Sequence, residues 1–68
     1  MTFPERLRQL RAEAGMSQKK LAEKSGISPN SIMRYESGKV DPTSFMLCCL
    51  ADALGVTTDY LLGRSEKK

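Results

Sequence analysis

A run of polar side chains near the middle of the chain recurs at spacings that would gather them on one side of a helix. Asn30, Arg34 and Ser37 lie three or four residues apart, so they form one row on a helical surface. Pro29 and Met33 form the row beside it. This surface carries a guanidinium, an amide and a hydroxyl but no acidic side chain. It therefore suits an anionic partner.

Two short helices joined by a tight turn must position these rows. A serine suited to cap a helix start and a glycine suited to follow a helix end flank each of the segments 18–25 and 29–37. Proline, which suits the first helical turn, opens the second segment. Two helices this close in sequence must pack at a steep angle. One face of the second helix is therefore left free.

Three further helices, over 2–14, 44–54 and 58–62, are predicted from apolar stripes and from their caps, including a Thr2–Glu5 capping box. The pattern predicts an all-α, compact five-helix domain over 1–63, followed by a charged tail that we expect to be disordered. The expected core residues are Phe3, Leu7, Leu10, Ala14, Met16, Leu21, Ala22, Ile27, Ile32, Tyr35, Leu47, Leu50, Ala51, Leu54, Val56 and Leu61.

The net charge of +3 is unevenly placed along the 68 residues. Residues 1–39 hold eight Lys and Arg against four Glu, whereas residues 40–68 hold three Lys and Arg against four acids. The first part therefore carries +4 and the second −1. A polyanion partner for the first part and a merely solvated basic surface both fit this asymmetry.

Several function classes lack the residues that they need. The chain has no His, and its two cysteines, Cys48 and Cys49, are too few for a structural zinc site and poorly placed on a helix to bridge each other. There are no paired carboxylates and no phosphate-cradling glycine loop, so we expect no enzyme, no metal and no cofactor. No apolar run reaches the ~20 residues of a membrane span, and the charged start lacks the apolar core of a secretory leader. We expect a reduced, cytoplasmic protein.

The central helix pair resembles the helix-turn-helix of the Xre/Cro family, the phage-repressor-like DNA-binding domains. The segments RLRQLRAEAGMSQ and LADALGVTTDYLL resemble the family's first helix and its last two helices, so the resemblance extends over most of the chain. The residues that carry it in the central pair are Gln18, Leu21, Ala22, Gly26, Ile27, Ser28, Ile32, Tyr35, Glu36, Gly38 and Lys39.

The resemblance implies that the helix over 29–37 enters the major groove of double-stranded DNA. The implied base-contacting residues are Pro29, Asn30, Met33 and Arg34, and the implied phosphate-contacting residues are Gln18, Ser28, Ser37 and Lys39. It also implies a structural salt bridge between Arg11 and Glu36.

The chemistry of these side chains agrees with the implied roles. Arg34 can donate two hydrogen bonds to guanine and Asn30 can pair with adenine. Met33 and Pro29 can touch a thymine methyl. A solvated role for Arg34 and a helix-supporting or phosphate-binding role for Asn30 stay open. Tyr35 is expected in the core. The lysines of the preceding helix suit a solvated face.

The helix over 44–54 departs from the family pattern. The position of Cys49 is often Lys in relatives and that of Phe45 is often polar. Their apolar face fits either local packing or a subunit interface. Because family dimers usually meet through C-terminal helices, Tyr60 and Leu62 are further interface candidates. A Cys49 at a two-fold axis could form an intermolecular disulfide.

These observations predict a sequence-specific transcription regulator, a repressor by preference, that binds a palindromic operator as a homodimer. It would be encoded by a bacterium or a phage and associated with the nucleoid, and it could contact RNA polymerase. The alternative is a protein-interaction or antitoxin-like module that uses the face of the helix over 44–54.

Overall fold

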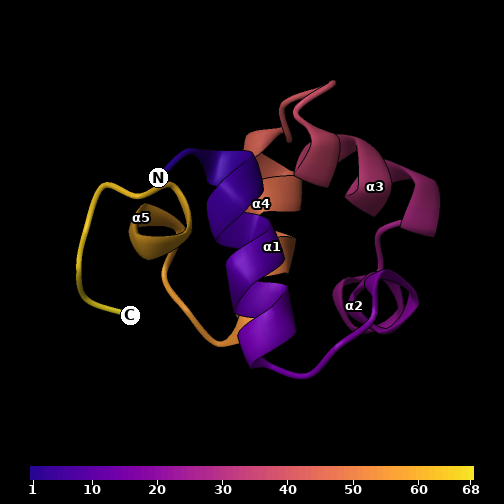
Figure 1. The fold of residues 1–68 in the computed structure, drawn as a ribbon, viewed down its shortest axis with the longest axis horizontal. Coiled ribbons are helices and arrows are strands. Elements are labelled where there is room, and N and C mark those ends of the chain that lie inside the picture. Colours follow the sequence, from indigo (N-terminus) through magenta and orange to yellow (C-terminus); the bar gives the residue numbers. More distant parts are fainter.

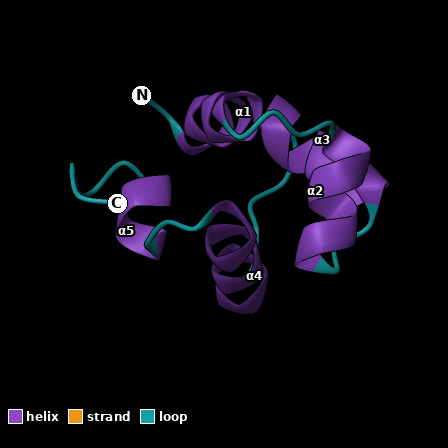
Figure 2. Ribbon diagram, turned by 90° about the horizontal axis from the view of Figure 1, so that it is seen from below, coloured by secondary structure: helices purple, strands orange, loops and turns teal.

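The computed structural model describes all 68 residues and contains five helices and no strand (Figures 1 and 2). The predicted all-α, five-helix fold is confirmed. Three helices have the predicted bounds, the first is one residue shorter at each end, and the last ends one residue earlier. The helices are α1 (Phe3–Glu13), α2 (Gln18–Ser25), α3 (Pro29–Ser37), α4 (Ser44–Leu54) and α5 (Thr58–Leu61).

Hydroxyl caps set the starts of the last four helices. Each capping oxygen accepts a hydrogen bond from the backbone N–H three residues further on, at 3.0 to 3.2 Å. The capping residues are Ser17, Ser28, Thr43 and Thr57. The glycines that end α2 and α3 have φ values of 76° and 78°, a left-handed conformation that is costly for any residue with a Cβ. These local signals explain why α2 and α3 have the predicted bounds.

The start of α1 is held by a hydrogen-bonded pair. The backbone N–H of Thr2 donates to Glu5 Oε1 at 3.0 Å, and the Thr2 hydroxyl donates to the same oxygen at 2.7 Å. The hydroxyl bond is the main cause that lowers the pKa of Glu5 from its ordinary value, followed by the backbone bond. The carboxylate also lies at the positive end of the helix dipole.

One fully buried side chain from each helix meets at the centre of the molecule. These five residues are Leu7, Leu21, Ile32, Leu50 and Leu61. Helix α1 packs against α3 and α5, while α2 packs against α3 and α4. Figure 1 shows α2 nearly end-on beside α3, which is seen lengthwise, so the two helices cross at a steep angle. This crossing turns one face of α3 away from the core.

Two details of the predicted core are wrong. Ala14 is exposed, because α1 ends at Glu13 and Ala14 caps its C-terminus. In α4, Ala53 is buried although it was not predicted. Leu47 and Leu54 are half-buried and pack against the core, as do Phe3, Met16 and Val56. Leu54 and Ala14 border the same surface groove, which lies between the α1–α2 connection, α2 and α4.

The last residues fold back over the start of α5. The backbone N–H of Thr57 donates to the carbonyl oxygen of Lys68 at 3.0 Å, and the Lys68 ammonium lies 5.8 Å from the centre of the Tyr60 ring. Disorder of residues 64–68 stays a prediction.

The longest helices, α1 and α4, have 11 residues each. None of the five helices has the length and apolar character of a membrane span.

The lowered pKa of Glu5 predicts how stability changes with pH. The ionised carboxylate stabilises the fold above its unfolded pKa of about 4.3, and this contribution is lost as the pH falls through the lower folded pKa. We expect Glu5→Gln to lower the melting temperature at neutral pH, and we expect the difference to disappear on acidification. Thermal unfolding followed by circular dichroism at a series of pH values measures this.

The matched control is Glu13→Gln, which removes a carboxylate from the opposite end of α1. A melting-temperature difference between Glu5→Gln and the unsubstituted chain that is the same at every pH would contradict the assignment.

Candidate nucleic-acid interface

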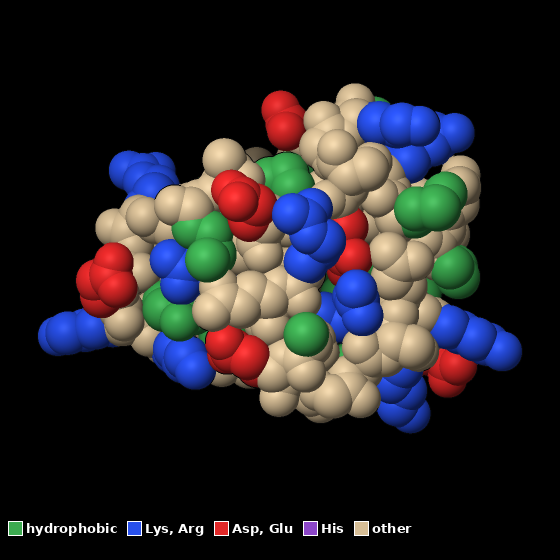
Figure 3. All heavy atoms as spheres, in the orientation of Figure 1, with side chains coloured by type: hydrophobic (Ala, Val, Ile, Leu, Met, Phe, Trp, Pro, Cys, Tyr) green, Lys and Arg blue, Asp and Glu red, His purple; other side chains and the backbone are tan.

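Helix α3 separates a buried face from an exposed one. Ile32 and Tyr35 are buried in the core, whereas Asn30, Met33 and Arg34 are exposed, with Met33 49% exposed. The amide of Asn30 and the guanidinium of Arg34 make no hydrogen bond or ion pair with another residue. Along the outer edge of α3, at the upper right of Figure 3, basic and hydrophobic side chains occur with no acidic one between them. The hydrogen-bond donors of Asn30 and Arg34 are therefore available to an outside partner.

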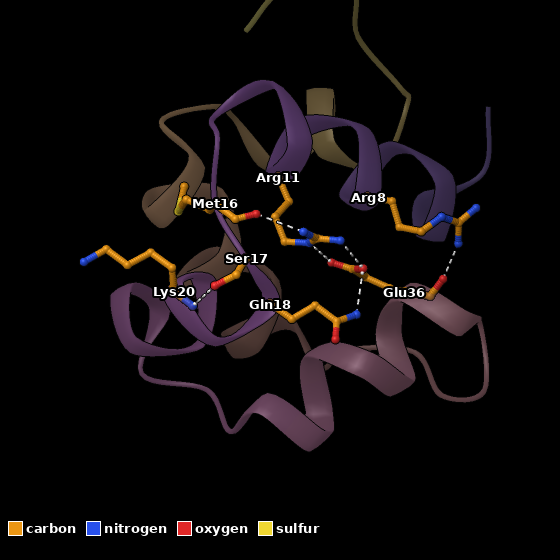
Figure 4. A network of polar contacts seen from close by, with 7 residues as sticks. All are labelled: Arg8, Arg11, Met16, Ser17, Gln18, Lys20 and Glu36. Atoms are coloured by element: carbon orange, nitrogen blue, oxygen red, sulfur yellow. Dashed lines mark hydrogen bonds and ion pairs between the residues drawn. The ribbon is translucent and has the colours of Figure 1, made fainter.

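The buried carboxylate of Glu36 ties α3 to the two preceding helices (Figure 4). Glu36 is only 3% exposed. Arg11 of α1 binds it with two nitrogens, Nε at 2.6 Å from Oε2 and Nη2 at 3.0 Å from Oε1. Gln18 of α2 donates to Oε1 at 3.0 Å. Arg11 and Glu36 are the pair for which the family resemblance implied a salt bridge, and they form the only ion pair of the chain.

Arg11 also links α1 to the turn before α2. Its Nη1 donates to the carbonyl oxygen of Met16 at 2.9 Å. The hydrogen bond to Glu36 raises the pKa of Arg11 above its ordinary value. A planar fork that satisfies a carboxylate on one side and a carbonyl on another holds α1, α2 and α3 at fixed distances.

Two of the predicted phosphate-contacting residues lie at opposite ends of the α2–α3 unit. Gln18 is the first residue of α2, and because its amide already donates one N–H to Glu36, its second N–H remains for another acceptor. Lys39 is exposed just beyond α3, and its ammonium has no partner within the chain. Their contacts with a phosphate stay predictions.

The two predicted serines are engaged in local hydrogen bonds. Ser28 caps α3 and donates its hydroxyl proton to Ser31 Oγ at 3.0 Å. Ser37 donates to the carbonyl oxygen of Arg34 at 3.1 Å. A hydroxyl carries a single proton, so each must turn before it can donate to an outside anion. Their phosphate contacts stay predictions.

The four predicted subunit-interface residues differ in exposure. Phe45 is 72% exposed, whereas Cys49, Tyr60 and Leu62 are half-buried. Both cysteines are free thiols. The Arg6 guanidinium lies 4.5 Å from the centre of the Tyr60 ring, and no hydrogen-bond partner reaches the buried Nε of Arg6. Tyr60 therefore has an intramolecular packing role, while Phe45 has the most free surface. The interface stays a prediction.

Sequence analysis missed a second arginine in the Glu36 cluster. Arg8 of α1 donates through Nη1 to the backbone carbonyl oxygen of Glu36. The usable signal was its spacing of three residues from Arg11, which puts the two side chains on one side of α1.

The fold and this cluster define the class of protein. Two capped helices joined by a glycine turn, with the second presenting an exposed polar row, form a helix-turn-helix unit inside a five-helix domain. The family model described as Helix-turn-helix matches residues 7–61. The chain belongs to this family, in its Xre/Cro type.

Two curated relatives and one solved structure illustrate the similarity. The chain is 41% identical over 66 residues to the HTH-type transcriptional regulator ImmR of Bacillus subtilis (strain 168), covering 97% of this chain and 52% of ImmR. It is 41% identical over 64 residues to the cryptic phage CTXphi transcriptional repressor RstR of Vibrio cholerae, covering 94% of this chain and 57% of RstR. The chain thus spans about half the length of these relatives.

The solved structure is the P22 c2 repressor protein in complex with a synthetic operator. Its TM-score is 0.88 at 29% identity, and the match covers 96% of this chain and 98% of that one. The five-helix arrangement is therefore shared almost from end to end.

Breaking the Arg11–Glu36 pair should destabilise the fold. Arg11→Met leaves the Glu36 carboxylate buried without its counter-ion. We expect a loss of about 3 kcal/mol in the free energy of unfolding, at the low end for a buried pair because the Arg11 side chain is 20% exposed. Urea denaturation at low temperature measures this loss.

The double variant Arg11→Met/Glu36→Met is the control, because it removes both charges and leaves apolar groups of similar length. We expect it to recover most of the lost stability. A double variant no more stable than Arg11→Met would contradict the role of the buried charge.

Proposed function

We propose that this chain is a sequence-specific, double-stranded DNA-binding transcription regulator that reads the major groove with α3. The observation that carries the proposal is the exposed outer row of α3, where Asn30 and Arg34 have no polar partner within the chain. The relatives named as regulators and the repressor solved with its operator support it. The mechanism is binding alone, in the cytoplasm. The bound domain represses by blocking RNA polymerase or acts by contacting it.

Base recognition rests on the row that faces away from the core. Arg34 donates two hydrogen bonds to the O6 and N7 atoms of a guanine, and Asn30 pairs with the N6 and N7 atoms of an adenine. Pro29 and Met33 supply apolar contacts for thymine methyl groups. Because α3 is fixed through Glu36, these side chains reach the groove from a rigid base.

Phosphate contacts flank the base-reading row. Gln18 and the backbone N–H groups at the start of α2 contact phosphates of one DNA strand, since a helix start favours an anion. Ser28 adds a hydroxyl at the start of α3. Ser37 and Lys39, together with the backbone N–H of Gly38, take the other backbone stretch. Affinity should come mainly from these charge contacts and fall steeply with salt.

Truncating Arg34 tests the base-reading role. We expect Arg34→Ala to weaken binding to the preferred site by about 1–3 kcal/mol and to relax one base position, because the lost contact is a bidentate pair. An unbiased selection from random duplex DNA at two salt concentrations defines the site, and titration of that site measures the loss.

Lys24→Ala is the matched control, since it removes one exposed cation from α2 without touching the outer row of α3. An Arg34→Ala protein that keeps full affinity and the same preferred site would refute the role. If the affinity of the unsubstituted chain for DNA depends on neither the DNA sequence nor the salt concentration, a protein-interaction module is favoured instead.

We further propose that two copies bind a palindromic operator, with half-sites about one helical turn, ~34 Å, apart. The exposed ring of Phe45 supports a contact through the start of α4, where the ten residues 42–51 carry no charge. Cys49 lies one turn further along this helix. Tyr60 of α5, whose other side packs on Arg6, and Leu62 just after α5 are half-buried and would add surface to the contact. A two-fold contact suits this surface because each copy offers the same apolar patch.

A charge at position 45 should weaken self-association. We expect Phe45→Asp to raise the dimer dissociation constant at least about tenfold, because an unpaired carboxylate would be buried at the contact. Sedimentation equilibrium without DNA measures it. Ala12→Glu, which adds the same charge at an exposed position of α1, is the control. Equal dissociation constants for the two variants would rule out this face.

A further inference from the structure

Arg8 is an exposed arginine whose side chain crosses from α1 to the end of α3. Its Nη1 donates to the backbone carbonyl oxygen of Glu36, and Figure 4 shows the rest of the guanidinium turned away from the Glu36 carboxylate. A guanidinium has five N–H donors, and no other hydrogen bond or ion pair engages those of Arg8. Four donors and a full positive charge are therefore exposed beside the end of α3.

This position lies next to the backbone stretch that follows α3. Glu36 directly precedes Ser37 and Gly38, and a Cβ on Gly38 would lie 3.5 Å from Pro4 Cγ. Pro4 and Arg8 are four residues apart on α1 and so share one face of that helix. This face of α1 thus borders the residues to which the proposed function assigns one run of phosphates.

A helix-capping role for Arg8 explains part of this geometry. The helix dipole favours a cation at the C-terminal end of a helix, and this capping role needs only one N–H donated to one carbonyl oxygen. The remaining donors, however, form a planar fork of the kind that binds phosphate oxygens in pairs. Because Arg8 is already exposed, such binding buries no new charge in the core.

We propose that Arg8 is a phosphate-contacting residue of the DNA interface and also positions α3. One side of its guanidinium holds the Glu36 carbonyl, and the other side binds a phosphate beside the one taken by Ser37 and Lys39. The inference rests on the proposed DNA-binding function and adds a contact from α1 to it. DNA bound in this way would therefore contact both α1 and the end of α3.

The number of released counterions tests the proposal. Each phosphate contact contributes about −0.9 to the slope of log affinity against log salt concentration. We expect Arg8→Gln to make that slope shallower by about 0.9 on a selected duplex, whereas Arg8→Lys should keep the slope because it keeps the charge. Arg64→Gln, which removes an exposed cation from the tail, should also leave the slope unchanged and controls for net charge.

The Arg8→Gln protein is compared at a temperature where circular dichroism shows that it is folded. If Arg8→Gln does not fold, Arg8→Ala, which also removes the charge, takes its place and should make the slope shallower by about 0.9. Weaker binding by Arg8→Gln with an unchanged slope would overturn the proposal and leave Arg8 as a helix cap only. An Arg8→Lys slope that falls by about 0.9 would also overturn it, because the charge is still present. Absence of salt-dependent binding by the unsubstituted chain would instead overturn the proposed function itself.

Discussion

The buried carboxylate of Glu36 is the constraint on which the candidate interface depends. Removing a charge from water costs several kcal/mol, and the two-pronged contact from Arg11 with the amide of Gln18 offsets that cost. An apolar trio could fill the same space with similar or greater stability. We infer that the charged cluster serves precision, because each hydrogen bond has one favourable geometry whereas apolar side chains can slide.

This precision matters in a chain so small. A domain of this size buries only about 60% of its unfolded surface, and its core consists of eleven buried apolar residues. These apolar residues bring the five helices together at the centre of the molecule. The polar cluster acts at the ends, joining the start of α2 and the end of α3 to the middle of α1. The apolar core thus joins the helices at their centres, and the Glu36 cluster joins the start of α2 and the end of α3 to α1.

The helix bounds were predictable because their signals are local. A hydroxyl at each start and a glycine after α2 and α3 fix the ends without any tertiary contact. The Arg11–Glu36 pair was expected only from the family resemblance, since its partners are 25 residues apart. The spacing of Arg8 from Arg11 indicates only that both side chains lie on one side of α1. The contacts of Arg8 with the Glu36 carbonyl and of Arg6 with Tyr60 were not predicted. They depend on how helices cross, which periodicity does not specify.

The side chains of Asn30, Met33 and Arg34 contribute little to holding the molecule together. They project from a helix whose position is set by its opposite face and by its ends, so exchanging them leaves the core and the Glu36 cluster intact. Under the proposed function, what α3 recognises could therefore change while the melting temperature stays nearly constant. In that case related chains would differ in their targets through a few substitutions on one helix, without compensating changes elsewhere.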